Sequence, residues 1–295
     1  MTAAAAAFLT AKTQNTVAPP NSTTMNNKPL AAHLPARILV FDSGVGGLSI
    51  VAEIQRQLPA CRISYCSDNA AFPYGTKSEK DLISRVDKVL RAACNLEAID
   101  IIVIACNSAS TLALPYLRNH FEQPVVGVVP AIKPAAQLSK NKRIGLLATP
   151  GTVSRSYTRQ LIDDFASDCQ VTSVGSSQLV NLAEQKLRGE TIEQAQLQSI
   201  LKPFKNTGID TLILACTHFP LLKDEIQVYL GSAVSLVDSA DAIARRIAYL
   251  LKSTETKVDP KEVNSSLFTA KNSDVDKLFD VLKKYHLQHS RYLQV

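Results

Sequence analysis

The sequence contains one stretch twice. The first copy, Ile99–Ser108, reads Ile-Asp-Ile-Ile-Val-Ile-Ala-Cys-Asn-Ser, and the second, Ile209–His218, reads Ile-Asp-Thr-Leu-Ile-Leu-Ala-Cys-Thr-His. The offset between the copies is constant (216 − 106 = 110). Each copy is a run of β-branched and apolar residues without polar alternation, which is typical of a parallel strand buried on both faces. The repeat therefore predicts two similar halves, each built on a parallel sheet.

Each copy ends in Ala-Cys, so Cys106 and Cys216 follow equivalent strands. In open parallel sheets, ligands bind just beyond the carboxyl ends of the strands. A weaker repeat relates Arg143–Gly151 to Arg37–Gly44, each a basic residue, a strand and a glycine turn. We therefore expect an α/β fold of two similar open domains with mostly parallel central sheets, and an active site in the cleft between them.

The remaining segments predict how the chain is divided. Residues 1–35 begin with an alanine run and continue rich in Thr, Asn and Pro, which predicts a disordered extension. The last helical pattern, at 274–285, is expected to pack back on the first half. We thus expect one α/β domain from 36–130 together with 240–295, and a second from 131–239.

Strands and helices alternate along these domains. Short apolar runs predict further strands at 37–41, 62–66, 125–129, 170–174 and 234–238. Apolar stripes at helical spacing predict helices at 48–58, 81–96, 108–117, 154–165, 179–188, 191–202, 240–252 and 274–285. Beyond residue 252, the last of these helices is the one element we expect.

Composition and charge narrow the class of function. The 32 Lys and Arg and 26 Asp and Glu give a net charge of +6, and the basic residues are scattered. A nucleic-acid surface needs a clustered basic face, so we expect no nucleic-acid partner. No apolar run approaches the roughly 20 residues of a membrane span, and the first basic residue, Lys12, follows the apolar start instead of preceding it. We therefore expect a cytoplasmic protein without a membrane partner.

The cysteines point to free thiols. None of the six forms a Cys-x-x-Cys pair, and in a chain of this length reduced thiols in the cytosol are favoured over disulfides. For Cys106 and Cys216, the alternatives are an inert core position or a zinc site. Zinc needs three or four ligands, and His218 alone lies nearby in the sequence. We expect neither a metal nor a cofactor.

A glycine turn, Asp42-Ser43-Gly44-Val45-Gly46-Gly47, follows the first strand. Such a turn can bind an anion through its amides, or it can simply allow close packing of the helix on the sheet. It is not a dinucleotide fingerprint, because Ser49 stands where the last glycine would be. Asp42 places a carboxylate at the end of the strand.

Two thiols facing one carbon suit the inversion of a stereocentre. One base removes a proton from one face while an acid delivers a proton to the other, and the groups exchange roles in reverse. A cysteine hydrolase needs a single thiol, so the repeated cysteine argues against that class of enzyme. We expect helix-terminal amides to lower the pKa of the Cys106 thiol, and His218 to exchange a proton with Cys216. Asn107, Ser108 and Thr217 offer hydrogen bonds to a substrate.

With these residues in view, the sequence resembles the glutamate racemases of the cofactor-independent aspartate/glutamate racemase superfamily. The similar segments run from about Arg37 to Leu250 and are Phe41–Leu48, Pro73–Gly75, Ala105–Ser110 and Ala215–Pro220. Small departures are Ser108, where Thr is common, and Phe219, where Tyr is common.

The resemblance implies interconversion of L- and D-glutamate, which supplies D-glutamate for peptidoglycan. It implies that Cys106 and Cys216 are the acid/base thiols, assisted by Asp42 and His218 respectively, with Glu184 as a further assistant. The residues that it implies in substrate binding are Asp42, Ser43, Tyr74, Gly75, Asn107, Ser108, Thr217 and His218.

Several alternatives remain open at this stage. The chain could racemise aspartate or another amino acid, or bind an amino acid without catalysis. Some relatives with N-terminal extensions respond to a UDP-muramoyl peptide, which is therefore an expected activator here. The sequence leaves open whether the chain forms a homodimer, and which thiol acts on which enantiomer.

Overall fold

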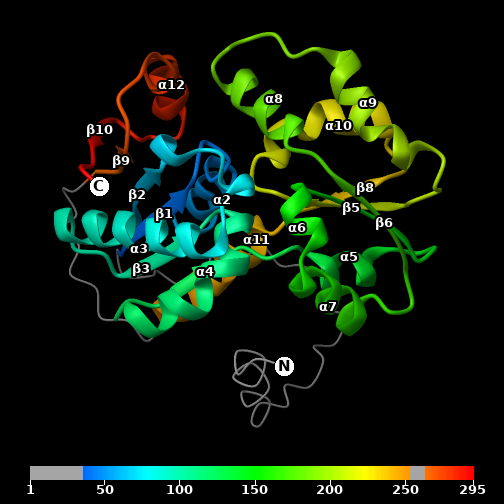
Figure 1. Ribbon diagram of the computed structural model, residues 1–295, viewed down its shortest axis with the longest axis horizontal. Helices are drawn as coiled ribbons and strands as arrows, with labels where there is room; N and C mark the ends of the chain where they lie inside the picture. The colour runs from blue at the N-terminus through cyan, green and yellow to red at the C-terminus, as the bar shows by residue number, and fades with distance from the viewer. Residues whose placement is uncertain (1–35, 253–262) are drawn as a thin grey trace. The chain divides into compact units, whose positions relative to one another are not determined.

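The computed structural model describes residues 36–252 and 263–295, and within them two sheets carry the fold (Figure 1). All strand pairs in this part of the chain are parallel. The first sheet has the strand order β10-β9-β2-β1-β3-β4, and the second has the order β6-β5-β7-β8. The strands of the first sheet are β1 Arg37–Asp42, β2 Arg62–Ser67, β3 Ile101–Ile104, β4 Val125–Gly127, β9 Ser265–Phe268 and β10 His289–Tyr292. Those of the second are β5 Arg143–Ala148, β6 Gln170–Gly175, β7 Thr211–Ala215 and β8 Ser235–Val237.

Helices connect and cover these strands. Those between strands of the first sheet, or after them, are α2 Leu48–Gln57, α3 Glu79–Leu96, α4 Asn107–His120, α11 Ala240–Leu251 and α12 Ser273–Lys284. Those around the second are α5 Ile132–Leu138, α6 Pro150–Ser154, α7 Ser156–Phe165, α8 Gln178–Leu187, α9 Gln194–Lys205 and α10 Lys223–Leu230. Short 3₁₀ turns are η2 Asn69–Ala71, η3 Tyr74–Thr76 and η4 Phe219–Leu222.

The predicted duplication is visible in the sheets. Four strands of the first sheet run β2-β1-β3-β4, and the second sheet runs β6-β5-β7-β8 in the same arrangement. The two cysteine strands, β3 and β7, therefore occupy equivalent places next to β1 and β5. The α/β class and the parallel sheets predicted from the repeat are confirmed.

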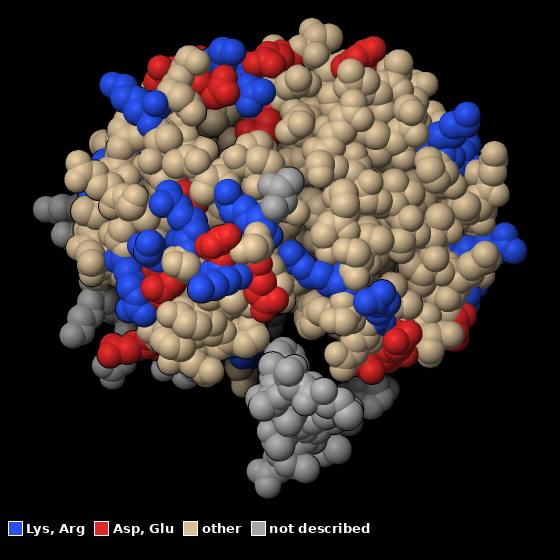
Figure 2. All heavy atoms as spheres, viewed as in Figure 1, with Lys and Arg blue, Asp and Glu red and all other residues tan. Residues whose placement is uncertain are grey.

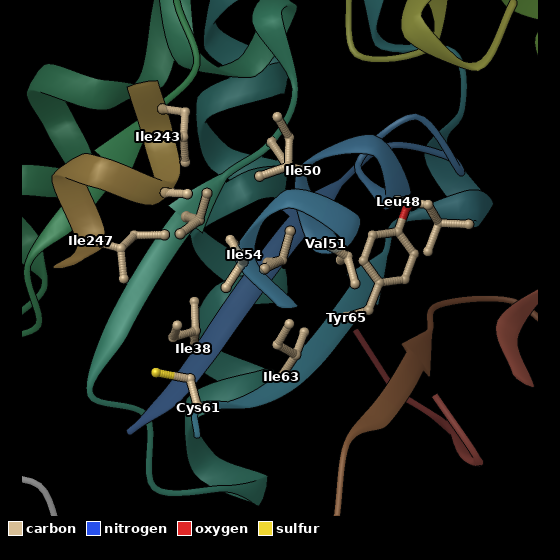
Figure 3. Close-up of a cluster of buried hydrophobic side chains, with 14 of the residues drawn as sticks. Ile38, Leu48, Ile50, Val51, Ile54, Cys61, Ile63, Tyr65, Ile243 and Ile247 are labelled. Carbon is tan, nitrogen blue, oxygen red and sulfur yellow. The ribbon is translucent and has the colours of Figure 1, made fainter. Parts of the chain in front are cut away.

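Both cysteine strands are buried on both faces, as their composition predicted. Along β3, Ile101 and Val103 join one apolar cluster, whereas Ile102 and Ile104 join the cluster on the opposite face. Figure 3 shows the first of these clusters, where side chains of α2 and α11 cover Ile38. The second sheet follows the same rule, because alternate residues of β7 divide between two further clusters. Burial on both faces fixes the ends of these strands in space, and the site is built on those ends.

The C-terminal part of the chain returns to the first half. Val275, Leu278 and Leu282 of α12 are buried in the same cluster as Ile38, so the predicted packing of this helix is confirmed. Two strands were not predicted: β9 and β10, with sequences Ser-Ser-Leu-Phe and His-Ser-Arg-Tyr, extend the first sheet beyond β2. They are short and largely polar, so no apolar run marks them.

The structure corrects two details of the predicted helices. The helix expected at 154–165 begins two residues later, as α7, and a short helix that was not predicted, α6, precedes it. Arg155, whose backbone is extended (φ −71°, ψ 142°), separates the two. The helix expected at 191–202 lies three residues later, at Gln194–Lys205. The break at Arg155 places that side chain at the end of α6.

The described residues, 36–252 and 263–295, belong to one compact unit. Within it, we propose the division into 36–130 with 240–295 and 131–239, because each range supplies the strands of one sheet. The extension predicted at 1–35 lies outside the described residues. In the described part of the chain, no helix is both long and apolar enough to cross a membrane. Lys and Arg are interspersed with Asp and Glu on the face shown in Figure 2, in keeping with the scattered charge of the sequence.

Candidate active site

The two repeated cysteines line one cavity. Cys106 lies directly before α4, and Cys216 directly follows β7. Both contribute to a cavity of about 80 Å³. They are nearly enclosed, since 6% of Cys106 and 7% of Cys216 is exposed. A water molecule needs roughly 10–15 Å³ of such space, so the cavity suits one small polar molecule and is too small for a nucleotide.

Most of the predicted site residues meet at this cavity. Besides the cysteines, those that line it are Ser43, Tyr74, Gly75, Asn107, Ser108, Thr217 and His218. The two predicted carboxylates, Asp42 and Glu184, are buried behind this lining. The structure thus brings all of the predicted residues to one place.

The lining also includes residues that were not predicted: Phe72, Pro73, Thr149, Ser177, Val180 and Asn181. The repeat contained a signal for one of them. Thr149 follows β5 as Ser43 follows β1, and both face the cavity. Ser177 and Asn181 lie at the start of α8, and nothing in the local sequence distinguishes them from an ordinary helix start.

Cys216 is the first of three buried side chains that contact one another in series. Its Sγ lies 3.9 Å from Nδ1 of His218, and Nε2 of His218 lies 2.8 Å from Oε1 of Glu184. The same Oε1 accepts a hydrogen bond of 2.9 Å from the backbone N–H of Val45. Glu184 therefore orients the imidazole, and the imidazole faces the thiol.

The electrostatic interactions among Cys216, His218 and Glu184 favour a proton on His218. Burial lowers the pKa of His218, but the hydrogen bonds to Cys216 and Glu184 outweigh burial, so the pKa lies well above its ordinary value. Burial raises the pKa of Glu184, yet the hydrogen bond and charge of His218 bring it below its ordinary value. An ionised Glu184 beside a protonated His218 is the arrangement that stabilises a thiolate at Cys216.

Cys106 contacts a different partner. Its Sγ lies 3.8 Å from Oγ of Ser43, and that hydroxyl lies 3.3 Å from Oδ1 of Asp42. The carboxylate predicted to assist Cys106 thus reaches it through the Ser43 hydroxyl. The strand register explains the contact, because Phe41 pairs with Ile104 and the next residues of both strands run on side by side.

The expected lowering of the pKa of Cys106 is wrong. The backbone at Ala109 lowers this pKa, as the helix start predicted, but burial is the larger effect, and the nearby Asp42 adds to it. Together they raise the pKa of Cys106 to about 12. Burial also raises the pKa of Asp42. A buried carboxyl with a raised pKa is a better base for this thiol than an exposed one.

The two thiol systems are joined across the cleft. Oγ1 of Thr217 donates a hydrogen bond of 2.9 Å to Oδ2 of Asp42, so the residue after Cys216 holds the carboxylate that serves Cys106. Tyr74 lines the cavity, and its hydroxyl donates a hydrogen bond of 2.6 Å to Asp68.

The cavity is built to bind an anion without lysine or arginine. Among the described residues, those lining it include neither. Instead, Cys106 and Ser177 are the residues that precede α4 and α8, and the N-terminal ends of helices favour negative charge. Nδ2 of Asn107, buried in the first turn of α4, has no hydrogen-bond partner within the described protein. An unpaired buried donor of this kind is a ready partner for a ligand oxygen.

The glycine turn serves close packing. A Cβ atom on Gly46 would lie 2.8 Å from both Cε1 and the backbone nitrogen of His218. A Cβ on Gly47 would lie 3.0 Å from the side chain of Asp42. The turn therefore lets the first half approach His218 of the second. No group of three or more His, Cys, Asp or Glu that could hold a metal occurs in the described ranges.

Comparison with known proteins places this geometry in a family. The family model for Asp/Glu/Hydantoin racemases matches residues 38–247, which include both cysteines and the whole cavity lining. The chain belongs to this family. Its α/β fold is thus that of an amino-acid racemase family.

Individual members of the racemase family agree with this assignment. The glutamate racemase of Shewanella loihica is 56% identical over 219 residues, 74% of this chain and 82% of that one. The glutamate racemase of Serratia proteamaculans is 46% identical over 278 residues, 94% of each chain. The structure of Escherichia coli glutamate racemase with L-glutamate and the activator UDP-MurNAc-ala has a TM-score of 0.85 at 46% identity, covering 88% of this chain and 98% of that one. Glutamate racemase from Aquifex pyrophilus has a TM-score of 0.67 at 32% identity, covering 88% and 98%.

Proposed function

We propose that this protein interconverts L- and D-glutamate, with Cys106 and Cys216 as the two acid/base groups. The observation that carries the proposal is the cavity in which the two thiols meet, each with a partner of its own. The similarity to curated glutamate racemases supports glutamate as the substrate, and aspartate or another amino acid is the alternative.

The reaction then proceeds in two proton transfers. One cysteine, as a thiolate, removes the α-proton from one face of glutamate and becomes a thiol. The other cysteine, as a thiol, gives its proton to the opposite face and becomes a thiolate. In the reverse direction the two exchange roles.

Each thiol has a different route to its thiolate. At Cys216, the proton passes to His218, whose imidazolium is stabilised by Glu184. At Cys106, the proton passes through the Ser43 hydroxyl toward Asp42, whose raised pKa suits it to accept a proton at a buried site. The two cysteines thus follow equivalent strands of the repeat, but an imidazole accepts the proton of Cys216 and a carboxylate accepts that of Cys106.

We further propose how the substrate lies. Glutamate carries two carboxylates, and the N-terminal ends of α4 and α8 offer two favourable positions for negative charge. The unpaired Nδ2 of Asn107 donates to one of them, with Ser108 nearby. The hydroxyl proton of Thr217 is directed at Asp42, so the oxygen of Thr217 is left to accept a hydrogen bond from the substrate ammonium group.

A UDP-muramoyl peptide is proposed as an activator, because the structure of the Escherichia coli relative contains one. A cavity of about 720 Å³, far larger than the catalytic one, offers it room. Arg118, Lys133 and Arg246 line this cavity and suit a diphosphate. Its lining also includes Val129 and Ser239, where the chain crosses between the halves and where Oγ of Ser239 donates to the carbonyl of Val129 at 2.6 Å. A ligand at these crossings would act on the hinge of the cleft.

We propose a cytoplasmic role in supplying D-glutamate for peptidoglycan. All six cysteines are free in the structure, and the mechanism requires two of them as thiols. Thiols persist in a reducing compartment.

The activator proposal has a direct test: initial rates with and without UDP-MurNAc-L-alanine, in the full chain and in Arg246→Gln. Equal rates in all four measurements would contradict it.

Circular dichroism of L-glutamate incubated with the protein tests the proposed function. Loss of ellipticity toward zero is the expected result for the wild type. Cys106→Ser and Cys216→Ser are each expected to abolish this change, whereas Cys94→Ser, a change at a half-buried helix position away from the cavity, should leave it intact. Full activity in both single variants at the cavity would contradict the mechanism, and turnover of L-aspartate alone would favour the alternative substrate.

A further inference from the structure

One basic side chain crosses from the second half of the chain to the helix that carries Cys106. Arg155, which separates α6 from α7, donates from Nη1 to the carbonyl of Ser108 at 3.2 Å. The same nitrogen donates to Oγ1 of Thr111. Both acceptors lie in the first two turns of α4, so the guanidinium joins the second half to the start of this helix.

The residues around Arg155 also lie where the second half of the chain contacts the first. The segment Thr149–Arg155 lies along the first half, because α6 packs against both α4 and η3. A Cβ atom on Gly151 would lie 3.5 Å from the carbonyl oxygen of Gly75. Thr149, Gly75 and Ser108 all line the catalytic cavity. This segment therefore forms one side of the enclosure around the thiols.

Access to the thiols requires this enclosure to open. Cys106 and Cys216 are almost fully buried, and the cavity between them measures about 80 Å³. The contact of Thr217 with Asp42, which also joins the halves, is buried within the site itself, and that of Lys277 with Glu190 is exposed. Arg155 is only partly buried, and it lies at the border of the cavity instead of inside it. It is thus a contact that solvent can reach before the interior is exposed.

We propose that Arg155 is a positioning residue that clamps the start of α4 to the second half and so keeps the two thiols enclosed and facing each other. It acts through the Ser108 carbonyl and the Thr111 hydroxyl and does not touch the reacting carbon. Burial lowers the pKa of Arg155, and the nearby Cys106 opposes this shift. Glu79 of α3 is the other charged group that faces it.

The clamp predicts how fast the thiols are alkylated. A hydrogen bond from a charged donor is typically worth about a factor of ten or more in an equilibrium. Arg155→Gln should therefore raise the rate at which iodoacetamide labels Cys106 and Cys216, without substrate, about tenfold. Cys66, fully buried in the core of the first half, reports unfolding and should label no faster than in the wild type. Arg155→Lys should restore labelling to within about threefold of the wild-type rate.

A double-mutant cycle tests the contact itself. Thr111→Val removes one acceptor and should accelerate labelling less than Arg155→Gln, and the double variant should label no faster than Arg155→Gln alone. Arg159→Gln is the matched control, because Arg159 lies one helical turn further on and is exposed. Labelling is read by mass spectrometry of the cysteine peptides.

The results that overturn the proposal are equally specific. Unchanged labelling of both catalytic thiols in Arg155→Gln would do so, as would acceleration at one thiol alone, equal acceleration of Cys66, or additive effects in the cycle. The proposal rests on the proposed function only for the roles of the two thiols. Labelling needs no glutamate, so it decides the clamp even if the protein fails to racemise glutamate, which a parallel activity assay would reveal.

Discussion

Replacing Glu184 by Gln is expected to slow racemisation by impairing one thiol and leaving the other intact. The substitution keeps an oxygen for the backbone N–H of Val45 but removes the charge that accepts from Nε2 of His218 at 2.8 Å. A hydrogen bond to a charged group is worth about 1.5–3 kcal/mol. Since about 1.4 kcal/mol is a factor of ten in rate, kcat should fall roughly 10- to 100-fold.

The assay can show which thiol is affected. Enantiomers have an equilibrium constant of one, so kcat/KM must fall equally in both directions and cannot identify the impaired group. Primary isotope effects, measured for each enantiomer, can identify the impaired group. With Cys216 weakened, proton removal by Cys216 limits the rate for one enantiomer of α-deuterated glutamate, and its isotope effect should rise. The isotope effect for the other enantiomer should fall, because proton removal by Cys106 is no longer limiting.

A matched control separates this effect from a change in surface charge. Arg188 pairs with both Glu184, at 3.6 Å, and Glu190, at 3.0 Å. No contact joins Glu190 to His218 in the described structure. Glu190→Gln should leave kcat and both isotope effects unchanged. A less than twofold change in kcat for Glu184→Gln, or isotope effects that stay equal for the two enantiomers, would refute the proposed role of Glu184.

Three further predictions concern the same site. Gly46→Ala should lower kcat more than about 100-fold, because its Cβ would meet the ring and backbone of His218, and steady-state kinetics on a folded variant would show it. Asp42→Asn should speed alkylation of Cys106 at pH 9, because the charge of Asp42 helps to raise the pKa of that thiol to about 12. Slower alkylation in this variant would contradict that effect of Asp42 on the thiol. The pKa of Glu184 is lower in the folded state than its ordinary 4.5, so its stabilisation is present above that value and lost as the pH falls. The melting temperature of the wild type should thus exceed that of Glu184→Gln at pH 7, and the difference should shrink below about pH 4.5.

The sequence predicted the fold best where burial dictates composition. The cysteine strands are apolar throughout because helices cover both faces of each sheet, and that pattern cannot be confused with a half-exposed strand. The strands β9 and β10 had no such signal. They are edge or near-edge strands of four residues each. β9 pairs with β2, and β10, which follows α12, pairs with β9, so their places in the sheet depend on where the chain returns and not on their own composition.

The site was predicted less evenly than the fold. Cys106, Cys216 and His218 follow strand ends, where parallel sheets bind ligands, so position in the sequence sufficed. Glu184 lies on a helix far from His218 in the chain, and its contact with the imidazole depends on how α8 packs. The pKa of Cys106 was predicted in the wrong direction because the local helix start was visible in the sequence, whereas full burial and the approach of Asp42 were not.

The central claim is that two sulfur atoms on opposite sides of one carbon exchange its proton. Its most direct measurement is the incubation of L-glutamate with the protein in heavy water, without added cofactor, followed by mass spectrometry of each enantiomer at early times. The D-glutamate formed should carry one deuterium at the α-position, while the remaining L-glutamate should contain little. Protium retained in the D-glutamate, or deuterium appearing equally in both enantiomers from the start, would show that a single group handles both faces and would contradict the account.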